Sequence, residues 1–142
     1  MLEKFATHVD RQNNVVSWIV KENLEEHDAL EAGQELPKLV LQLPKGAAKV
    51  LADHRPIELE GKQARLAIEA SQESVKLMGW LTTNCSLVAV ICGSMMMQSQ
   101  MNRLAKEAGL EQKLKAFWSA NQTKAVEDAY KFLGITDNAL IR

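Results

Sequence analysis

The acidic run over residues 22–31 is the best candidate in the sequence for metal chemistry. It contains Glu22, Glu25, Glu26, Asp28 and Glu31, and on a helix Glu22 would share a face with Glu25 and Glu26. Carboxylates of this kind hold Mg²⁺ when an adjacent helix supplies a second pair. The sequence contains no second E-x-x-D-like pair downstream. We therefore interpret the run as an acidic, solvated helix face and predict no metal site.

The sequence also lacks the common catalytic and cofactor motifs. The Gly-Lys pair at residues 61–62 is followed by glutamine and has no glycine five residues before it, so it is not a phosphate loop. Neither G-x-G-x-x-G nor the G-x-S-x-G elbow occurs. The histidines form no i,i+4 pair of metal ligands, and they stand far apart at His8, His27 and His54. We therefore predict a protein that is not an enzyme and that holds no cofactor.

The two cysteines, Cys85 and Cys92, have the spacing of neither a zinc site nor a local disulfide. On one helix they would share a face, but the helical rise alone would separate them by about 10 Å. That separation is too large for a disulfide. Residues 1–6 do not resemble a signal peptide, so we expect a cytoplasmic protein whose thiols stay reduced. Both cysteines are therefore predicted to be packed core residues.

Residues 103–110 resemble the first helix and turn of a helix-turn-helix, which is a DNA-binding motif. Ala105 and Gly109 have the spacing that the motif uses, and Leu110 follows the turn. Lys115, however, falls where the second helix usually needs an apolar residue. The cations available for phosphate contacts are Arg103, Lys106, Lys113, Lys115 and Lys124. DNA binding through residues 103–124 is therefore an alternative function.

The stretch from Leu77 to Asn102 contains no charged residue. Its length is sufficient to cross a bilayer, which needs about 20 residues, and Trp80 lies near one end, where an interfacial aromatic residue would be found. Polar residues are scattered through the stretch, and only residues 87–92 are densely apolar. Three interpretations follow, namely a buried helix over residues 86–101, a membrane span over residues 77–102 and a buried strand over residues 87–91. We favour the buried helix at the centre of a bundle.

Three consecutive methionines within this stretch predict a surface that binds a partner. Adjacent helix positions point about 100° apart, so three in a row cannot all face one core. Methionine side chains are flexible, and adaptable binding surfaces use them often, although they also fill gaps in crowded cores. A predicted N-terminal helix supplies the other apolar candidates. The proposed partner-binding residues are Phe5, Val9, Val16, Met95, Met96 and Met97.

The overall composition favours helices. The chain has only three prolines and seven glycines, and strong helix formers dominate it. Apolar spacing predicts one long helix or two short ones over residues 2–32, with an end at Gly33. Further helices follow up to Gly109 with an interruption at residues 82–84, and a last helix lies between Ser119 and Gly134. Residues 39–59 contain two short alternating runs that suggest a β-ribbon. We therefore predict one all-α domain over residues 1–142, a bundle of about five helices with a minor β-ribbon near residues 39–59.

The charge balance gives no global signature of a nucleic-acid or membrane protein. The formal net charge is −1, with 46% hydrophobic and 25% charged residues. Because catalytic motifs are missing and apolar surface is in surplus, we predict a non-catalytic adaptor or regulator that acts through helix-mediated protein contacts. A protein partner and a homodimer are expected.

Overall fold

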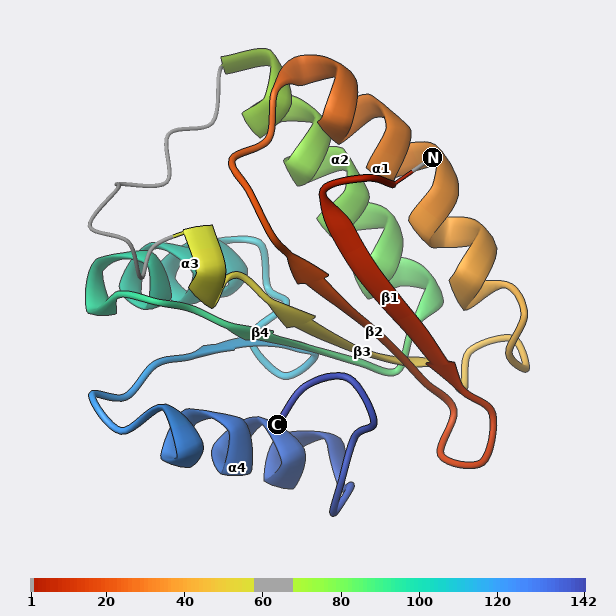
Figure 1. Ribbon diagram of the computed structural model, residues 1–142, viewed down its shortest axis with the longest axis vertical. Coiled ribbons are helices and arrows are strands. Elements are labelled where there is room, and N and C mark those ends of the chain that lie inside the picture. Colours follow the sequence, from red (N-terminus) through yellow and green to blue (C-terminus); the bar gives the residue numbers. More distant parts are fainter. Residues whose placement is uncertain (1, 58–67) are drawn as a thin grey trace.

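The computed structural model describes residues 2–57 and 68–142, and the side chains of residues 68–72 and 74 lie outside that description. The centre of the molecule is a five-stranded sheet in the order β1-β2-β3-β4-β5 (Figure 1). β1 runs antiparallel to β2, and all later neighbours are parallel. The strands are β1 (Phe5–Asp10), β2 (Val15–Val20), β3 (Lys49–Asp53), β4 (Leu87–Ile91) and β5 (Leu114–Phe117).

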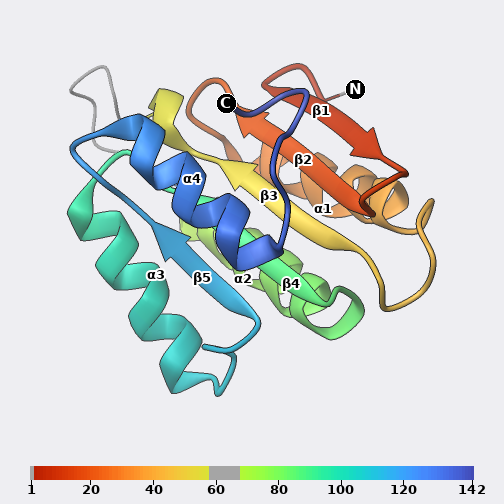
Figure 2. The same cartoon turned by 90° about the horizontal axis from the view of Figure 1, so that it is seen from below.

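Helices cover both faces of the sheet. They are α1 (Glu26–Val40), α2 (Ile68–Asn84), α3 (Met95–Glu107) and α4 (Gln122–Leu133), with a short 3-10 turn at Arg55–Ile57. α1, α2 and α3 connect successive parallel strands from β2 to β5. Because such connections are right-handed and each moves one strand further along the sheet, all three helices lie on one face. α4 covers the opposite face (Figure 2).

The two faces of the sheet form two apolar cores. Along β2, Val16, Trp18 and Val20 belong to the core under α1, α2 and α3, whereas Val15 faces the core under α4. Strands β3 and β4 are buried on both faces. Every side chain of β4 and the three middle side chains of β3 are therefore apolar, as is typical of parallel strands between helices.

The prediction of an all-α bundle is wrong, and the first error lies at the N-terminus. Residues 2–32 form the β1–β2 hairpin and only the beginning of α1. The polar run at residues 11–14 is the hairpin turn, where the Asp10 carboxylate accepts bonds from the backbone N–H groups of Gln12 and Asn13. Asn14 adopts a left-handed conformation with φ of 57°, which asparagine tolerates better than most residues. Gly33, the predicted helix end, lies inside α1.

The favoured interpretation of the uncharged stretch is also wrong. α2 ends at Asn84, Leu87–Ile91 forms the interior strand β4, and α3 begins at Met95. The buried strand was one of the three interpretations, and the structure confirms it. The chain does leave the helix at residues 82–84, where the Thr82 hydroxyl and the Asn84 amide both donate to main-chain carbonyls one turn earlier. Among residues 2–57 and 68–142, none of the helices combines the length and the apolar character needed to cross a membrane.

The ribbon predicted near residues 39–59 does not form as expected. Leu39 and Val40 belong to the end of α1, which continues through Pro37. The strand of this region is β3, and it pairs in parallel with β2 and β4 and not with a neighbouring segment of a local ribbon. Leu59, part of the second predicted strand, lies outside the described residues. Only the tertiary contacts with β2 and β4 reveal β3, because the Ala-Lys-Val-Leu-Ala run is also compatible with a helix.

Several local predictions at helix ends and in the core are correct. Gly109 and Gly134 follow α3 and α4 with φ of 72° and 71°, the left-handed conformation that glycine adopts without a steric penalty. Cys85 and Cys92 are both buried thiols, although they follow α2 and β4 and do not share a helix. One helix start differs from the prediction. The N-cap of α4 lies two residues after Ser119, at Asn121, because the Asn121 side chain accepts a hydrogen bond from the N–H of Thr123.

Ser17 gives a prediction about stability. Its side chain is 0% exposed in β2, and its hydroxyl has no hydrogen-bond partner among the described residues. A buried hydroxyl without a partner costs about 1–3 kcal/mol. We therefore expect Ser17→Ala to raise the free energy of unfolding by about 1 kcal/mol, after the smaller loss of packing is subtracted. Urea unfolding of both proteins measures the change, and a destabilised variant would show that the hydroxyl has a partner such as a buried water.

Candidate functional site

An apolar cavity of about 120 Å³ lies between the sheet and the three helices on one face. Its floor is formed by side chains of β2, β3 and β4, including Trp18, Ala52 and Val88. Its walls come from α1, α2 and α3, and Ile57 of the 3-10 turn adds a further side chain. Segments far apart in the sequence therefore build one pocket, which is partly open to solvent.

Small side chains on two elements create this space. Ala29 and Ala32 on α1 and Ala52 on β3 line the cavity, and each is at most 4% exposed. Protein cores are normally packed without voids larger than a water molecule. Among the described residues, this apolar pocket is therefore a candidate binding site.

Methionines give the cavity an adaptable wall. Met78 of α2 and Met97 and Met101 of α3 all line it. Their unbranched thioether side chains change shape at little cost, so the wall can adjust to ligands of different outline. Met97, predicted to lie on a partner surface, lines this cavity. Met95 and Met96 are 59% and 60% exposed, which confirms that the three methionines do not share one core.

His54 is the polar group of the cavity wall. It follows β3 directly, and its backbone N–H donates to the Ile91 carbonyl at 2.9 Å, which holds the residue beside β4. Burial lowers the pKa of His54, and the nearby Asp53 carboxylate only partly opposes this effect. The imidazole is therefore neutral at pH 7, with one ring nitrogen as a donor and the other as an acceptor. It is the one titratable side chain among the described residues that line the cavity.

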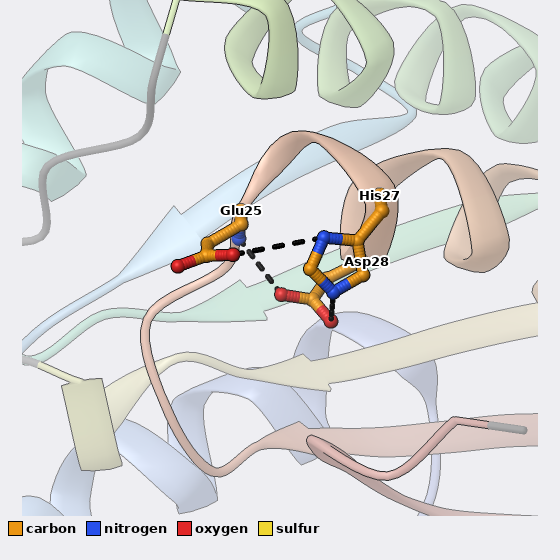
Figure 3. A group of neighbouring side chains, drawn as sticks. All are labelled: Glu25, His27 and Asp28. Atoms are coloured by element: carbon orange, nitrogen blue, oxygen red, sulfur yellow. Dashed lines mark hydrogen bonds and ion pairs between the residues drawn. The ribbon is translucent and has the colours of Figure 1, made fainter.

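The acidic run holds a separate cluster at the beginning of α1 (Figure 3). Ligand atoms of Glu25, His27 and Asp28 lie within 4.8 Å of one another, and His27 is 3.6 Å from Glu25 and 3.3 Å from Asp28. Asp28 is already engaged, because it accepts bonds from the Glu25 backbone N–H at 2.8 Å and from the Lys4 ammonium at 2.7 Å. Glu25 and His27 are both 73% exposed. Glu25 is the N-cap of α1 and Asp28 bonds its backbone, so the capping of the helix accounts for the proximity of these side chains. We assign the cluster no metal.

Asp28 gives a second prediction about stability. Burial raises its pKa, but the bonds from Lys4 and from the Glu25 backbone outweigh this and hold the pKa below its ordinary value of 3.8. The carboxylate thus stabilises the fold above about pH 4, and this contribution is lost as the pH falls through the lowered pKa. We expect Asp28→Ala to lower the free energy of unfolding by about 1–2 kcal/mol at pH 7.

Urea unfolding at pH 7 and at pH 2.5 checks this expectation. The difference between wild type and Asp28→Ala should shrink at the lower pH. The matched control is Glu26→Ala, which removes an exposed carboxylate from the same helical turn and should cost less than about 1 kcal/mol. Equal effects of the two substitutions at pH 7 would contradict the role of Asp28.

The other predicted partner-binding residues are not on a helix. Phe5 and Val16 lie on β1 and β2, are 8% and 0% exposed, and belong to the core. Val9 is partly buried and packs against the same core. A partner cannot contact Phe5 or Val16 in the folded protein. Phe5 instead lines the apolar cavity, a role that the sequence analysis did not anticipate.

The segment that resembled a helix-turn-helix has a different structure. α3 and the Gly109 turn are present, but residues 114–117 form β5 where the second helix was expected. Arg103 and Lys106 lie on α3, whereas Lys124 lies on α4, across the sheet, and pairs with Asp128 at 3.0 Å. The Lys113 ammonium donates to the Thr82 carbonyl at 3.0 Å, and Lys115 is exposed on β5. The predicted cations therefore do not form one surface, and no recognition helix follows the turn.

The chain is thus an α/β domain with a mixed five-stranded sheet and an apolar pocket on one face. The structure is similar to the crystal structure of an uncharacterized protein of the DUF3478 family with a SpoIIAA-like fold, from Shewanella loihica PV-4. The TM-score is 0.60 over 88% of this chain and 93% of that chain, at 12% sequence identity. At this identity the similarity supports the SpoIIAA-like fold alone. No family model matches the sequence, and neither does any curated protein.

Proposed function

We propose that this protein is a non-catalytic binding domain that takes a small, mainly apolar ligand into the cavity under α1, α2 and α3. The observation that supports this proposal is the cavity of about 120 Å³, which is lined by apolar side chains and one neutral imidazole. An engineered cavity of about 150 Å³ with apolar walls stays dry and binds benzene. The cavity of this protein is of comparable size and chemistry.

The single polar group narrows the class of ligand. A neutral His54 offers one donor and one acceptor, which suits an alcohol or a carbonyl group at one end of an apolar body. A charged ligand does not fit, because an ion without a partner is costly to bury. A short-chain alcohol, or one end of a longer acyl chain, is uncharged and also offers a polar group to His54.

Ligand titration with a cavity-filling variant tests this proposal. Binding of 1-hexanol is followed through the methyl NMR signals of Met78, Met97 and Met101. Ala32→Leu adds a side chain to the cavity from α1, and we expect it to weaken binding at least tenfold. The matched control is Ala108→Leu, at the exposed C-cap of α3, which should leave binding unchanged. Equal binding by Ala32→Leu and wild type, or no shift of the methionine signals in wild type, would overturn the proposal.

A second candidate function is contact between two copies of the chain through α3. The observation that favours it is the exposure of Met95, Met96 and Leu104, at 59%, 60% and 54%. Large apolar side chains that are exposed on one helix often contribute to interfaces. Light scattering of wild type and Met96→Asp tests it. An unchanged mass in the variant, or a monomeric wild type, would argue against a dimer through this surface.

A further inference from the structure

A second cavity, of about 220 Å³, lies at the carboxyl ends of β3, β4 and β5. Its lining includes Arg55, Gly93, Trp118, Ser119 and Gln122, and it shares no lining residue with the apolar cavity. In open α/β sheets, ligands bind beyond the carboxyl ends of the parallel strands. The position of this cavity therefore agrees with that rule, and its chemistry is different from that of the first.

The central group of this cavity is the guanidinium of Arg55, which the fold holds in one orientation. Its Nε donates to one oxygen of Asp53 at 2.9 Å, and its Nη2 donates to the other at 2.8 Å. The same carboxylate accepts the backbone N–H of Arg55 at 3.0 Å. The side chains of Arg55 and Asp53 are only 11% and 4% exposed. Two of the five N–H groups of arginine are used in this way, and the bonds among the described residues leave three on the remaining edges of the guanidinium.

A guanidinium that is fixed by a buried carboxylate is well suited to bind an oxyanion. The planar fork of arginine matches the two oxygens of a carboxylate, and little side-chain entropy is lost because the group is already ordered. The beginning of α4 lies at the same cavity, since Gln122 is its first residue. The positive end of the helix dipole adds to the preference for a negative group.

The remaining lining is mixed, since Ser119 and Gln122 are polar, but it includes an apolar part. Trp118 is partly buried at the end of β5, and its ring lines the cavity beside Ala120 and Ala125. An inorganic ion would leave this wall without a contact, whereas an organic anion with an apolar body would cover it. The volume is smaller than the roughly 300–1,000 Å³ of sites for drug-sized ligands.

We propose that this cavity binds a small organic carboxylate, with its oxygens on the outer edge of the Arg55 guanidinium and its apolar body against Trp118. The site is independent of the apolar cavity and of the function proposed for it. Benzoate is a suitable probe, and benzamide is its neutral counterpart of nearly the same shape. The proposal requires that the charged probe bind more tightly than the neutral one.

The first experiment is calorimetric titration of the full chain with benzoate, benzamide and inorganic phosphate at low salt. We expect benzoate to bind at least tenfold more tightly than benzamide. Ala120→Glu should weaken benzoate binding about threefold or more, and Ala120→Lys should strengthen it, because the exposed position 120 lines the cavity. Neither substitution should change benzamide binding. Ala120→Glu places a negative charge near the start of α4, which favours the helix, so its effect will not arise from unfolding.

The second experiment tests Arg55 itself and the separation of the two cavities. Arg55→Lys retains the charge but loses the planar fork, and we expect benzoate binding to fall at least tenfold. A thermal melt of this variant checks that it is folded, and the Ala120 pair remains informative if it is not. Ala32→Leu, which fills the apolar cavity, should leave benzoate binding unchanged. Equal binding of benzoate and benzamide, loss of benzoate binding in Ala32→Leu, or binding of phosphate without benzoate would each overturn the proposal.

Discussion

Acidification is expected to release an apolar ligand from the cavity under α1, α2 and α3, through protonation of His54. The bound ligand would exclude water from an imidazole that is already buried, and a positive charge beside an apolar ligand is unfavourable. Binding of 1-hexanol should therefore weaken about tenfold for each unit by which the ligand lowers the pKa of His54 further. This prediction rests on the proposed function.

The direction of the pH dependence follows from the pKa of His54. Burial holds it below the ordinary value of 6.5, with Asp53 opposing the shift. The unfolded chain thus takes up the proton at a higher pH than the folded protein does. The contribution of neutral His54 to stability is complete above about pH 6.5 and is lost as the pH falls below that value through the lowered pKa. Ligand affinity should follow the same course, high at pH 7.5 and decreasing toward pH 5.

Two histidine variants separate His54 from the other titrating groups. His54→Gln keeps a polar side chain that does not titrate, and 1-hexanol binding by this variant should be nearly independent of pH between 7.5 and 5. His27→Gln is the matched control, because its side chain is 73% exposed at the beginning of α1 and does not line the cavity. It should retain the pH dependence of wild type. A pH-independent wild type, or an unchanged dependence in His54→Gln, would contradict the prediction.

Among the substitutions proposed for this protein, removal of the Arg55 guanidinium should cause the largest decrease in the free energy of unfolding. Arg55 and Asp53 form a buried ion pair with two hydrogen bonds, and the Asp53 residue is 3% exposed at the end of the central strand β3. Truncation of one partner leaves a buried carboxylate without its counterion, which typically costs about 3–5 kcal/mol. We expect Arg55→Met to lower the free energy of unfolding by this amount, as measured by urea unfolding.

A double-mutant cycle shows whether the loss arises from the uncompensated charge. Asp53→Asn combined with Arg55→Met removes both charges, so the pair should be less destabilised than the sum of the two single variants by more than 1 kcal/mol. The control is Lys124→Met, which removes an exposed partner of Asp128 and should change stability by less than about 1 kcal/mol. Additive effects of the two buried substitutions would show that the ion pair itself is not the cause.

The N-terminal hairpin shows how a sequence pattern can be compatible with two structures. Leu2, Phe5, Val9, Val16 and Val20 recur at helical spacing, and this periodicity predicted a helix. The same residues fit two strands, because residues 15–20 are dense in β-branched and aromatic side chains and Asp10 begins a tight turn. Pairing with β1 and β3 decides between the two, and pairing is not visible in a local window.

The prediction also missed the interior strands β3 and β4, for a related reason. A strand that is buried on both faces loses the alternation of polar and apolar residues that identifies strands in a sequence. Leu87–Ile91 was therefore assigned to a buried helix, although its lack of charge correctly indicated burial on all sides. The candidate cavity could not be predicted once these strands were missed. Its floor consists of Trp18, Ala52 and Val88, which come together only in the parallel sheet.

The sequence by itself determined features that depend on one residue and its immediate neighbours. These are the helix ends at Gly109 and Gly134, the break after residues 82–84, the buried thiols and the exposure of part of the methionine run. Each follows from local backbone sterics or from hydrophobicity. The tertiary structure decided the fold class, the apolar cavity and the Arg55 site, because strand pairing and helix packing join residues that are distant along the chain. Those contacts outweigh local propensities, which differ by only about 1 kcal/mol per residue or less.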